Sequence, residues 1–349
     1  MQNRETELPF LGNIGLIMTY KCQVRCPHCI LDAGPHRTEE VNAEEALDWI
    51  RQITAYENSK VIILSLTGGE PFYDIEKLRL ISDYADTQGL YVSAVTNAYW
   101  ASSPEEAARV LAQVPAIRML SLSTDVYHQR FIPFQNIKNA IRAIQDLEKQ
   151  YTVAVCMEDA NDPALRKIRE ELLTVTTQDH IFSALTFPVG RAMQHVDAGR
   201  YPMSAQVPAS ACVTCSSPIL FPDGHVVACI GPLIDLTYPH ALYLGNIREE
   251  SLQSILDRAQ MNPILHVLRV WGPRKLIQML QEAGYEHLLA RNYVEGSICS
   301  ACYQLFSNPQ INELLLALTA KPAFMREVAY ARLYYMNESQ MAQAIPYAS

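Results

Sequence analysis

Residues 14–29 read Ile-Gly-Leu-Ile-Met-Thr-Tyr-Lys-Cys-Gln-Val-Arg-Cys-Pro-His-Cys, an apolar run that leads directly into three closely spaced cysteines. The run at 14–20 predicts a short buried β-strand. Cys22, Cys26 and Cys29 follow in one loop, and three thiolates can hold three irons of a [4Fe-4S] cluster and leave the fourth iron open for another ligand. A zinc knuckle is the alternative, although zinc sites favour paired Cys-x-x-Cys halves.

A second apolar run at 61–66 ends in the glycine pair of the sequence Thr-Gly-Gly-Glu-Pro, residues 67–71. Adjacent glycines after a strand let backbone come close to a ligand without obstruction by side chains. Alone, such a segment is more often an ordinary turn. Its place one strand–helix unit after the cysteines indicates a second part of the same site.

The first 190 residues alternate between strand and helix patterns. Four more strands are predicted at 91–96, 117–123, 152–157 and 182–187, and capping patterns predict helix starts at Asn42, Ser103 and Asp162. Repeated β–α units indicate a parallel sheet with right-handed crossovers. Six units are fewer than the eight of a closed barrel. We therefore expect an α/β fold, a partial (β/α)6 TIM-like barrel with its chemistry at the C-terminal strand ends.

The cysteine loop and the Gly-Gly-Glu-Pro segment, in this order, resemble the signatures of radical S-adenosylmethionine (SAM) enzymes. The resemblance implies that Cys22, Cys26 and Cys29 hold a [4Fe-4S] cluster whose open iron binds the amino and carboxylate groups of SAM. It also implies a set of SAM-binding residues, namely His28, Gly68, Gly69, Glu70, Pro71, Asn97, Ser123 and Arg191. Arg191 could pair with the SAM carboxylate, and a surface arginine paired with a nearby acid is the alternative.

Five more cysteines lie beyond the predicted barrel, at positions 212, 215, 229, 299 and 302. The stretch from Cys212 to Cys229, with Gly224 four residues before its last cysteine, resembles the opening of the SPASM and twitch auxiliary-cluster domains. This resemblance implies one auxiliary [4Fe-4S] cluster on Cys212, Cys229, Cys299 and Cys302, with Cys215 as an alternative ligand. Two Cys-x-x-Cys pairs could instead form a zinc site. Cys156, within the fifth strand pattern, is expected to be a small buried residue.

Length, charge and cysteine usage exclude several classes of protein. The 349 residues carry a net charge of −9, which argues against a nucleic-acid partner. The N-terminus lacks an apolar signal segment, and no run of about twenty apolar residues predicts a membrane span. Cluster thiolates require a reducing compartment, so we expect a cytoplasmic protein. We expect a barrel at 1–204, an auxiliary domain at 205–305 and a helical tail at 306–349.

The resemblance to radical SAM enzymes implies a mechanism. A reduced cluster, fed by an external donor such as flavodoxin or ferredoxin, cleaves SAM to a 5′-deoxyadenosyl radical that takes hydrogen from the substrate. The auxiliary cluster could accept an electron from the substrate, bind the substrate or relay electrons. Asp125, Tyr127 and His128 follow the fourth strand and are the candidate catalytic residues, with a structural loop role as the alternative for each.

Three hypotheses remain for the function. The first is modification of a ribosomally made peptide by crosslinking, epimerisation or oxidation. Because the first strand begins about a dozen residues into the chain, a separate leader-peptide-binding protein would then deliver the peptide. The second is oxidation of a small alcohol such as an aminocyclitol, as in twitch-type dehydrogenases. The third belongs to another class, a zinc-bearing binding protein without catalysis.

Overall fold

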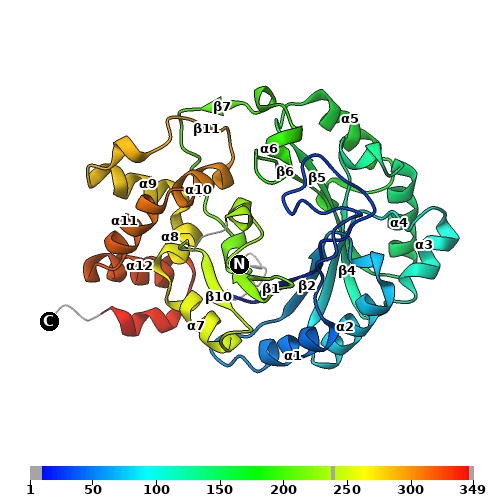
Figure 1. The fold of residues 1–349 in the computed structure, drawn as a ribbon, viewed down its shortest axis with the longest axis horizontal. Helices are drawn as coiled ribbons and strands as arrows, with labels where there is room; N and C mark the ends of the chain where they lie inside the picture. The colour runs from blue at the N-terminus through cyan, green and yellow to red at the C-terminus, as the bar shows by residue number, and fades with distance from the viewer. Residues whose placement is uncertain (1–9, 237–239, 346–349) are drawn as a thin grey trace, which may run out of the picture.

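Six parallel strands form the main sheet of the molecule, and the helices that connect them lie along its outer side (Figure 1). The structure is a computed structural model that describes residues 10–236 and 240–345. The strands pair in sequence order and are β1 (Asn13–Thr19), β2 (Ile63–Gly68), β3 (Tyr91–Thr96), β4 (Ile117–Ser123), β5 (Gln150–Met157) and β6 (Ile181–Leu185). The helices between them are α1 (Ala43–Thr54), α2 (Ile75–Thr87), α3 (Pro104–Leu111), α4 (Phe134–Asp146) and α5 (Pro163–Leu172). The predicted α/β partial barrel is confirmed.

The barrel helices begin where the capping patterns place them. The side chain of Asn42 accepts hydrogen bonds from two backbone N–H groups of α1, at 2.8 and 3.2 Å. Ser103 and Asp162 each accept one such bond at the start of α3 and α5, at 3.1 and 2.7 Å. Each cap satisfies an N–H group that has no partner within the helix and contributes about 1 kcal/mol to stability.

Burial alternates along the strands and defines an outer and an inner face of the sheet. On β5, Val153 and Val155 are buried in the main hydrophobic core. The alternate residues of the same strand, Ala154 and Cys156 among them, are half-buried. Successive side chains of a strand point to opposite faces. Cys156 therefore lies on the face of β5 opposite the core, and our expectation of a simply buried cysteine was wrong.

The sheet continues past β1 into the C-terminal half of the chain. Strand β8 (Ile219–Leu220) pairs in parallel with β1, and β9 (His225–Val227) and β10 (Tyr243–Asn246) follow it in antiparallel order, giving nine strands. Gly15 on β1 allows β8 to approach, because a Cβ atom at this position would lie only 3.1 Å from the Ile219 side chain. The domain boundaries at 204/205 and 305/306 stay predictions.

Helices from the last hundred residues lie across the open side of the partial barrel (Figure 1). They are α7 (Leu252–Met261), α8 (Pro263–Trp271), α9 (Pro273–Glu282), α10 (Ile298–Phe306), α11 (Pro309–Thr319) and α12 (Pro322–Tyr335). A two-stranded sheet of β7 (Met203–Ser204) and β11 (Tyr293–Val294) lies apart from the main sheet. Helices α8 and α9 are separated at Gly272, where φ is +75°. No helix within residues 10–236 and 240–345 has the length and apolarity to cross a membrane.

Candidate active site

One cavity, with a volume of about 130 Å³, lies at the C-terminal ends of the barrel strands. It is enclosed by the cysteine loop and by the ends of β2, β3 and β4. Its lining residues are Cys22, Val24, Cys26, His28, Cys29, Ala33, Gly68, Gly69, Val95, Thr96, Asn97, Ser123 and His128. The fold therefore brings the three predicted cluster cysteines to one wall of a single cavity, and several predicted SAM-binding residues line the same space.

The three cysteines of the loop line the same cavity, and their thiols are in electrostatic contact. Burial raises the pKa of Cys22 to about 12, and the charges of Glu70, Cys26 and Cys29 raise it further. Burial also raises the pKa of Cys29, and Cys26 adds to this effect while Arg191 opposes it. The ionisation of Cys22 and Cys29 is thus disfavoured in the metal-free protein, and a bound metal cation would favour it, with release of protons. The donor set thus fits a cluster with three protein ligands.

Gly68 and Gly69 are required by close contact between two backbone segments. A Cβ atom on Gly68 would collide with the carbonyl oxygen of Thr19, and the residue has φ of +141°. A Cβ atom on Gly69 would collide with the carbonyl oxygen of Lys21 and would lie 2.7 Å from its carbonyl carbon. The Gly69 N–H donates to the Thr19 carbonyl at 2.6 Å. The glycine pair therefore holds the start of the cysteine loop as well as lining the cavity.

Glu70 is fully buried and connects the ends of β2 and β3. Its carboxylate accepts hydrogen bonds from the Phe72 N–H at 3.1 Å, the Thr96 hydroxyl at 2.8 Å and the Asn97 N–H at 2.9 Å. Burial raises the pKa of Glu70 to about 7, and these three hydrogen bonds oppose the shift. Neither Glu70 nor the adjacent Pro71, which is buried and begins a 3₁₀ turn, belongs to the cavity lining.

Asn97 reaches the cysteine loop from the end of β3. Its side-chain N–H group lies 3.7 Å from the Cys22 sulfur, and its side-chain oxygen accepts a hydrogen bond from Gln23 at 2.8 Å. Ser123 lines the same cavity from the end of β4. Since the Glu70 carboxylate holds the backbone of Asn97, the network orients an amide directly beside a predicted cluster ligand.

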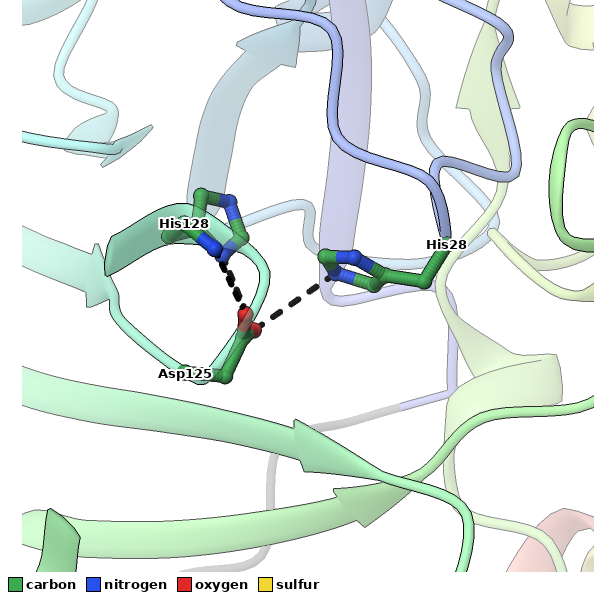
Figure 2. Close-up of side chains that lie close together, drawn as sticks. All are labelled: His28, Asp125 and His128. Atoms are coloured by element: carbon green, nitrogen blue, oxygen red, sulfur yellow. Dashed lines mark hydrogen bonds and ion pairs between the residues drawn. The ribbon is translucent and has the colours of Figure 1, made fainter. Parts of the chain in front are cut away.

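Asp125 gathers two histidines at the wall of the cavity (Figure 2). One carboxylate oxygen lies 2.9 Å from Nδ1 of His128 and 3.5 Å from Nε2 of His28, and the other accepts the backbone N–H groups of Tyr127 and His128 at 2.9 Å each. Burial disfavours protonation of His128, but the charge and hydrogen bond of Asp125 outweigh burial and raise its pKa well above the usual value. Burial lowers the pKa of His28 to about 4.

Of the three predicted catalytic residues, only His128 lines the cavity. Asp125 is 1% exposed, and its carboxylate oxygens contact the two histidines and accept hydrogen bonds from the backbone of its own loop. Tyr127 is buried, stacks on the His28 ring with a centroid separation of 4.7 Å, and donates its hydroxyl to Glu158 at 2.5 Å. Asp125 and Tyr127 therefore position the two histidines.

Arg191 lies behind the cysteine loop and makes its contacts there. Its guanidinium donates to the Asp32 carboxylate at 2.7 Å and to the backbone carbonyls of Cys26 and Ala33 at 3.0 and 2.5 Å. The residue is 4% exposed and does not line the cavity. The structure thus brings Arg191 to the predicted site, but against the loop that carries the cysteines.

The five C-terminal cysteines gather at a second location, formed by α10, the segment after β9 and the turn before β8. Cys299 and Cys302 lie one helical turn apart on α10, and Cys229 follows β9. The backbone N–H of Cys212 donates to the Leu268 carbonyl at the end of α8, at 2.9 Å. The side chain of Cys215 is 1% exposed, and its sulfur donates to the carbonyls of Cys212 and Leu265 at 3.1 and 3.7 Å.

The four predicted auxiliary ligands, Cys212, Cys229, Cys299 and Cys302, lie near one another. Burial raises the pKa of Cys302 well above its usual value, and the other three cysteines raise it further. Burial also raises the pKa of Cys229, with contributions from Cys212 and Cys299. Burial and Cys212 raise the pKa of Cys299 to about 11. All six pairs among these four thiols are thus within electrostatic reach.

Sequence reasoning missed two acids of the site, Asp32 and Glu158. Glu158 directly follows Met157, the last residue of β5, and accepts hydrogen bonds from Tyr127 and from Thr186. An acid immediately after a predicted strand was a signal for it. Asp32 pairs with Arg191 across 159 positions of sequence, and no local pattern indicates that contact.

Comparison with known proteins finds a family match for part of the chain and a relative that is similar over most of it. The family model described as "Radical SAM superfamily" matches residues 16–172, which include the cysteine loop and the barrel through α5. YydG of Bacillus subtilis (strain 168), whose descriptive name refers to peptide biosynthesis, is 21% identical over 306 residues. That match covers 85% of this chain and 92% of YydG.

Two solved structures are similar at a low level. BtrN in complex with AdoMet and 2-DOIA is 10% identical, with a TM-score of 0.35, and the match covers 74% of this chain and 87% of that chain. The methyltransferase TsrM from Kitasatospora setae, with cobalamin and a [4Fe-4S] cluster bound, is 15% identical, with a TM-score of 0.39, and the match covers 54% of this chain and 39% of that chain.

Proposed function

Residues 16–172 form a radical SAM domain, and on that premise we propose that the chain modifies a ribosomally made peptide by abstracting a hydrogen atom from it. A crosslink, an epimerised residue or an oxidised residue would be the product. A cluster on Cys22, Cys26 and Cys29, together with SAM, would supply the 5′-deoxyadenosyl radical that performs the abstraction. An auxiliary [4Fe-4S] cluster would assist.

The observation that carries the proposal is the convergence of three cysteines from one loop on the cavity at the strand ends. The loop is held on two sides. The Gly69 N–H and the Glu70 N–H donate to the carbonyls of Thr19 and Lys21, at 2.6 and 2.9 Å. Fixed ligands and a cavity wall of small residues, Gly68, Gly69 and Ser123, leave room for a cofactor at the rim where parallel barrels perform chemistry.

The protein's own residues would orient the reactants and exclude water. Asn97 places an amide N–H beside the Cys22 sulfur, and hydrogen bonds to cluster sulfurs influence the reduction potential. His28 and His128, fixed by Asp125, line the same cavity.

The likeness to YydG supports a peptide as the substrate. It extends over 85% of this chain and so includes residues outside the family match. The match of residues 16–172 to the radical SAM family model favours an enzyme over the non-catalytic zinc protein. A small alcohol stays the alternative substrate for the experiment below. An external reductant and a separate leader-peptide-binding protein are further parts of this proposal.

The spacing of the C-terminal cysteines supports an auxiliary cluster over zinc. In a tetrahedral zinc site with Zn–S bonds of about 2.3 Å, the sulfurs lie roughly 3.8 Å apart. Within residues 10–236 and 240–345, the only set of three or more such ligand atoms that all lie within 4.8 Å of one another is that of His28, Asp125 and His128. A four-iron cube holds its thiolates farther apart than one zinc ion does.

The test uses anaerobically reconstituted protein, a chemical reductant, SAM and uniformly deuterated substrates. The peptides are those that short reading frames found next to the gene encode, and the other substrate is an aminocyclitol. We expect deuterium in 5′-deoxyadenosine from a peptide alone, together with a changed peptide mass or a changed residue configuration. Transfer from the aminocyclitol alone, or from neither substrate, would contradict the proposal.

A further inference from the structure

Arg191 binds the cysteine loop at several points from a distant part of the sequence. Each nitrogen of its guanidinium donates to the loop: Nε to the Asp32 carboxylate, one terminal nitrogen to the Cys26 carbonyl and the other to the Ala33 carbonyl. Its backbone N–H donates to the Cys29 carbonyl at 3.2 Å. One residue thus binds the loop at both of its last two cysteines and at its end.

The backbone around Arg191 is shaped to fit this loop. Gly190 has φ of +56°, and a Cβ atom there would lie 2.7 Å from the Ile30 carbonyl oxygen and 3.0 Å from the Cys29 carbonyl oxygen. Asp32, the partner of Arg191, also adopts a left-handed conformation with φ of +49°. Non-glycine residues rarely take this conformation, and it persists only where surrounding contacts enforce it. Arg191 supplies such a contact.

The guanidinium also brings a permanent positive charge to the site. An arginine does not lose its proton in proteins, and the Arg191 side chain is 3% exposed, so water screens its charge little. Asp32, its carboxylate partner, is 55% exposed and is better screened. The charge lies against the cysteine loop, since the guanidinium donates to the Cys26 carbonyl and the Arg191 backbone N–H donates to the Cys29 carbonyl.

These contacts leave little of the guanidinium for another anion. A bidentate bond to a carboxylate needs two parallel N–H groups on one edge of the fork. One edge of Arg191 already faces Asp32, and the terminal nitrogens face the two loop carbonyls. The side chain is buried behind the loop rather than in the cavity wall. The Arg191 guanidinium therefore has no free edge with which to bind the SAM carboxylate, as the resemblance implied.

We propose that Arg191 is a positioning residue for the cluster: it locks the cysteine loop in its ligand-bearing shape and holds a positive charge beside the thiolates, and it does not bind SAM. This inference rests on the proposed cluster at Cys22, Cys26 and Cys29. A locked loop would retain iron, and a buried positive charge would favour the more negative, reduced state of the cluster. Arg191 would thereby raise the reduction potential.

The test compares R191K and R191Q with the wild-type holoenzyme. Lysine keeps the charge but not the planar fork, whereas glutamine loses both. Outer contacts of metal ligands typically change metal affinity by about 10- to 100-fold. We expect both variants to lose iron to a chelator at least about tenfold faster than wild type. We expect a lower reduction potential in R191Q and a potential near that of wild type in R191K.

The potential is read from the electron paramagnetic resonance signal that changes when SAM is added, which selects the cluster with the open iron. R118Q is the matched control, because Arg118, on β4, forms an exposed ion pair with Asp86 and its replacement should change neither readout. Urea unfolding of each iron-free variant separates loss of the fold from loss of iron. Iron release is then expressed per folded protein.

Three results would overturn the inference. In the first, R191Q keeps the wild-type iron release and potential. In the second, the variants unfold more easily but folded protein releases iron at the wild-type rate with an unchanged potential. In the third, only the affinity for SAM falls. A wild-type protein that holds no iron at this loop would instead contradict the proposed function itself.

Discussion

Replacement of Gly69 by alanine should break the contact between the end of β2 and the cysteine loop. The new Cβ atom would collide with the Lys21 carbonyl oxygen and would lie 2.7 Å from the Lys21 carbonyl carbon and 2.9 Å from the Tyr20 carbonyl carbon. All three are backbone atoms, so no flexible side chain can move aside. Overpacking of this kind costs about 1–3 kcal/mol. The displaced segment directly precedes Cys22, so the first cluster should be lost.

G89A is the matched control for this substitution. Gly89 has φ of +82°, and no atom lies within 4 Å of the place that a Cβ atom would take there. Its alanine variant should therefore cost about 1–2 kcal/mol through backbone strain alone. Urea unfolding of the iron-free proteins should show similar losses of stability for both variants. Only G69A should lose about half of the iron after reconstitution, and wild-type iron content in G69A would refute the reasoning.

Three further predictions follow from individual contacts. Alanine at any one of Cys212, Cys229, Cys299 and Cys302 should lower the iron content of the auxiliary site and abolish product formation, while SAM cleavage persists. C215A should keep its iron, because the Cys215 sulfur donates to two backbone carbonyls. Iron loss in C215A with full iron in C212A would reverse the assignment. Burial raises the pKa of Glu70 from 4.5 to about 7, so between pH 4.5 and 7 the folded protein keeps a proton that the unfolded chain loses. The free energy of unfolding of the iron-free protein should therefore fall as the pH rises through this range. Urea unfolding at pH 5 and pH 7.5 measures this fall, and E70Q should make it smaller. Y127F should lose about 1–3 kcal/mol in the same assay, because the buried Glu158 carboxylate loses a donor, and an unchanged unfolding midpoint would show that this hydrogen bond contributes nothing.

Local features of the chain were predictable because their causes are local. The caps at Asn42 and Ser103 depend on neighbouring residues alone, and both are confirmed. The alternation of strand and helix patterns likewise predicts the partial barrel. Strand β8 has only two residues, and its pairing with β1 depends on the fit between Gly15 and Ile219. A segment so short carries no periodicity that sequence could reveal.

Long-range contacts explain why the site was predicted only in part. Cys22, Cys26 and Cys29 act within one loop, so their spacing was sufficient to place them together. Spacing could not predict the partner of Arg191, because the Arg191 guanidinium contacts a loop about 160 positions earlier in the sequence. Gly69 was expected to give room to a ligand, and the structure shows that it also gives room to the backbone of Lys21.

Formation of 5′-deoxyadenosine tests the central claim most directly. Wild-type protein and a variant with alanine at Cys22, Cys26 and Cys29 would be reconstituted anaerobically with iron and sulfide, reduced, and supplied with SAM. The account predicts 5′-deoxyadenosine from the wild type, with about eight irons per chain in two four-iron clusters, and none from the triple variant, with about half the iron. Equal formation by both proteins, or no formation by an iron-loaded wild type, would contradict it.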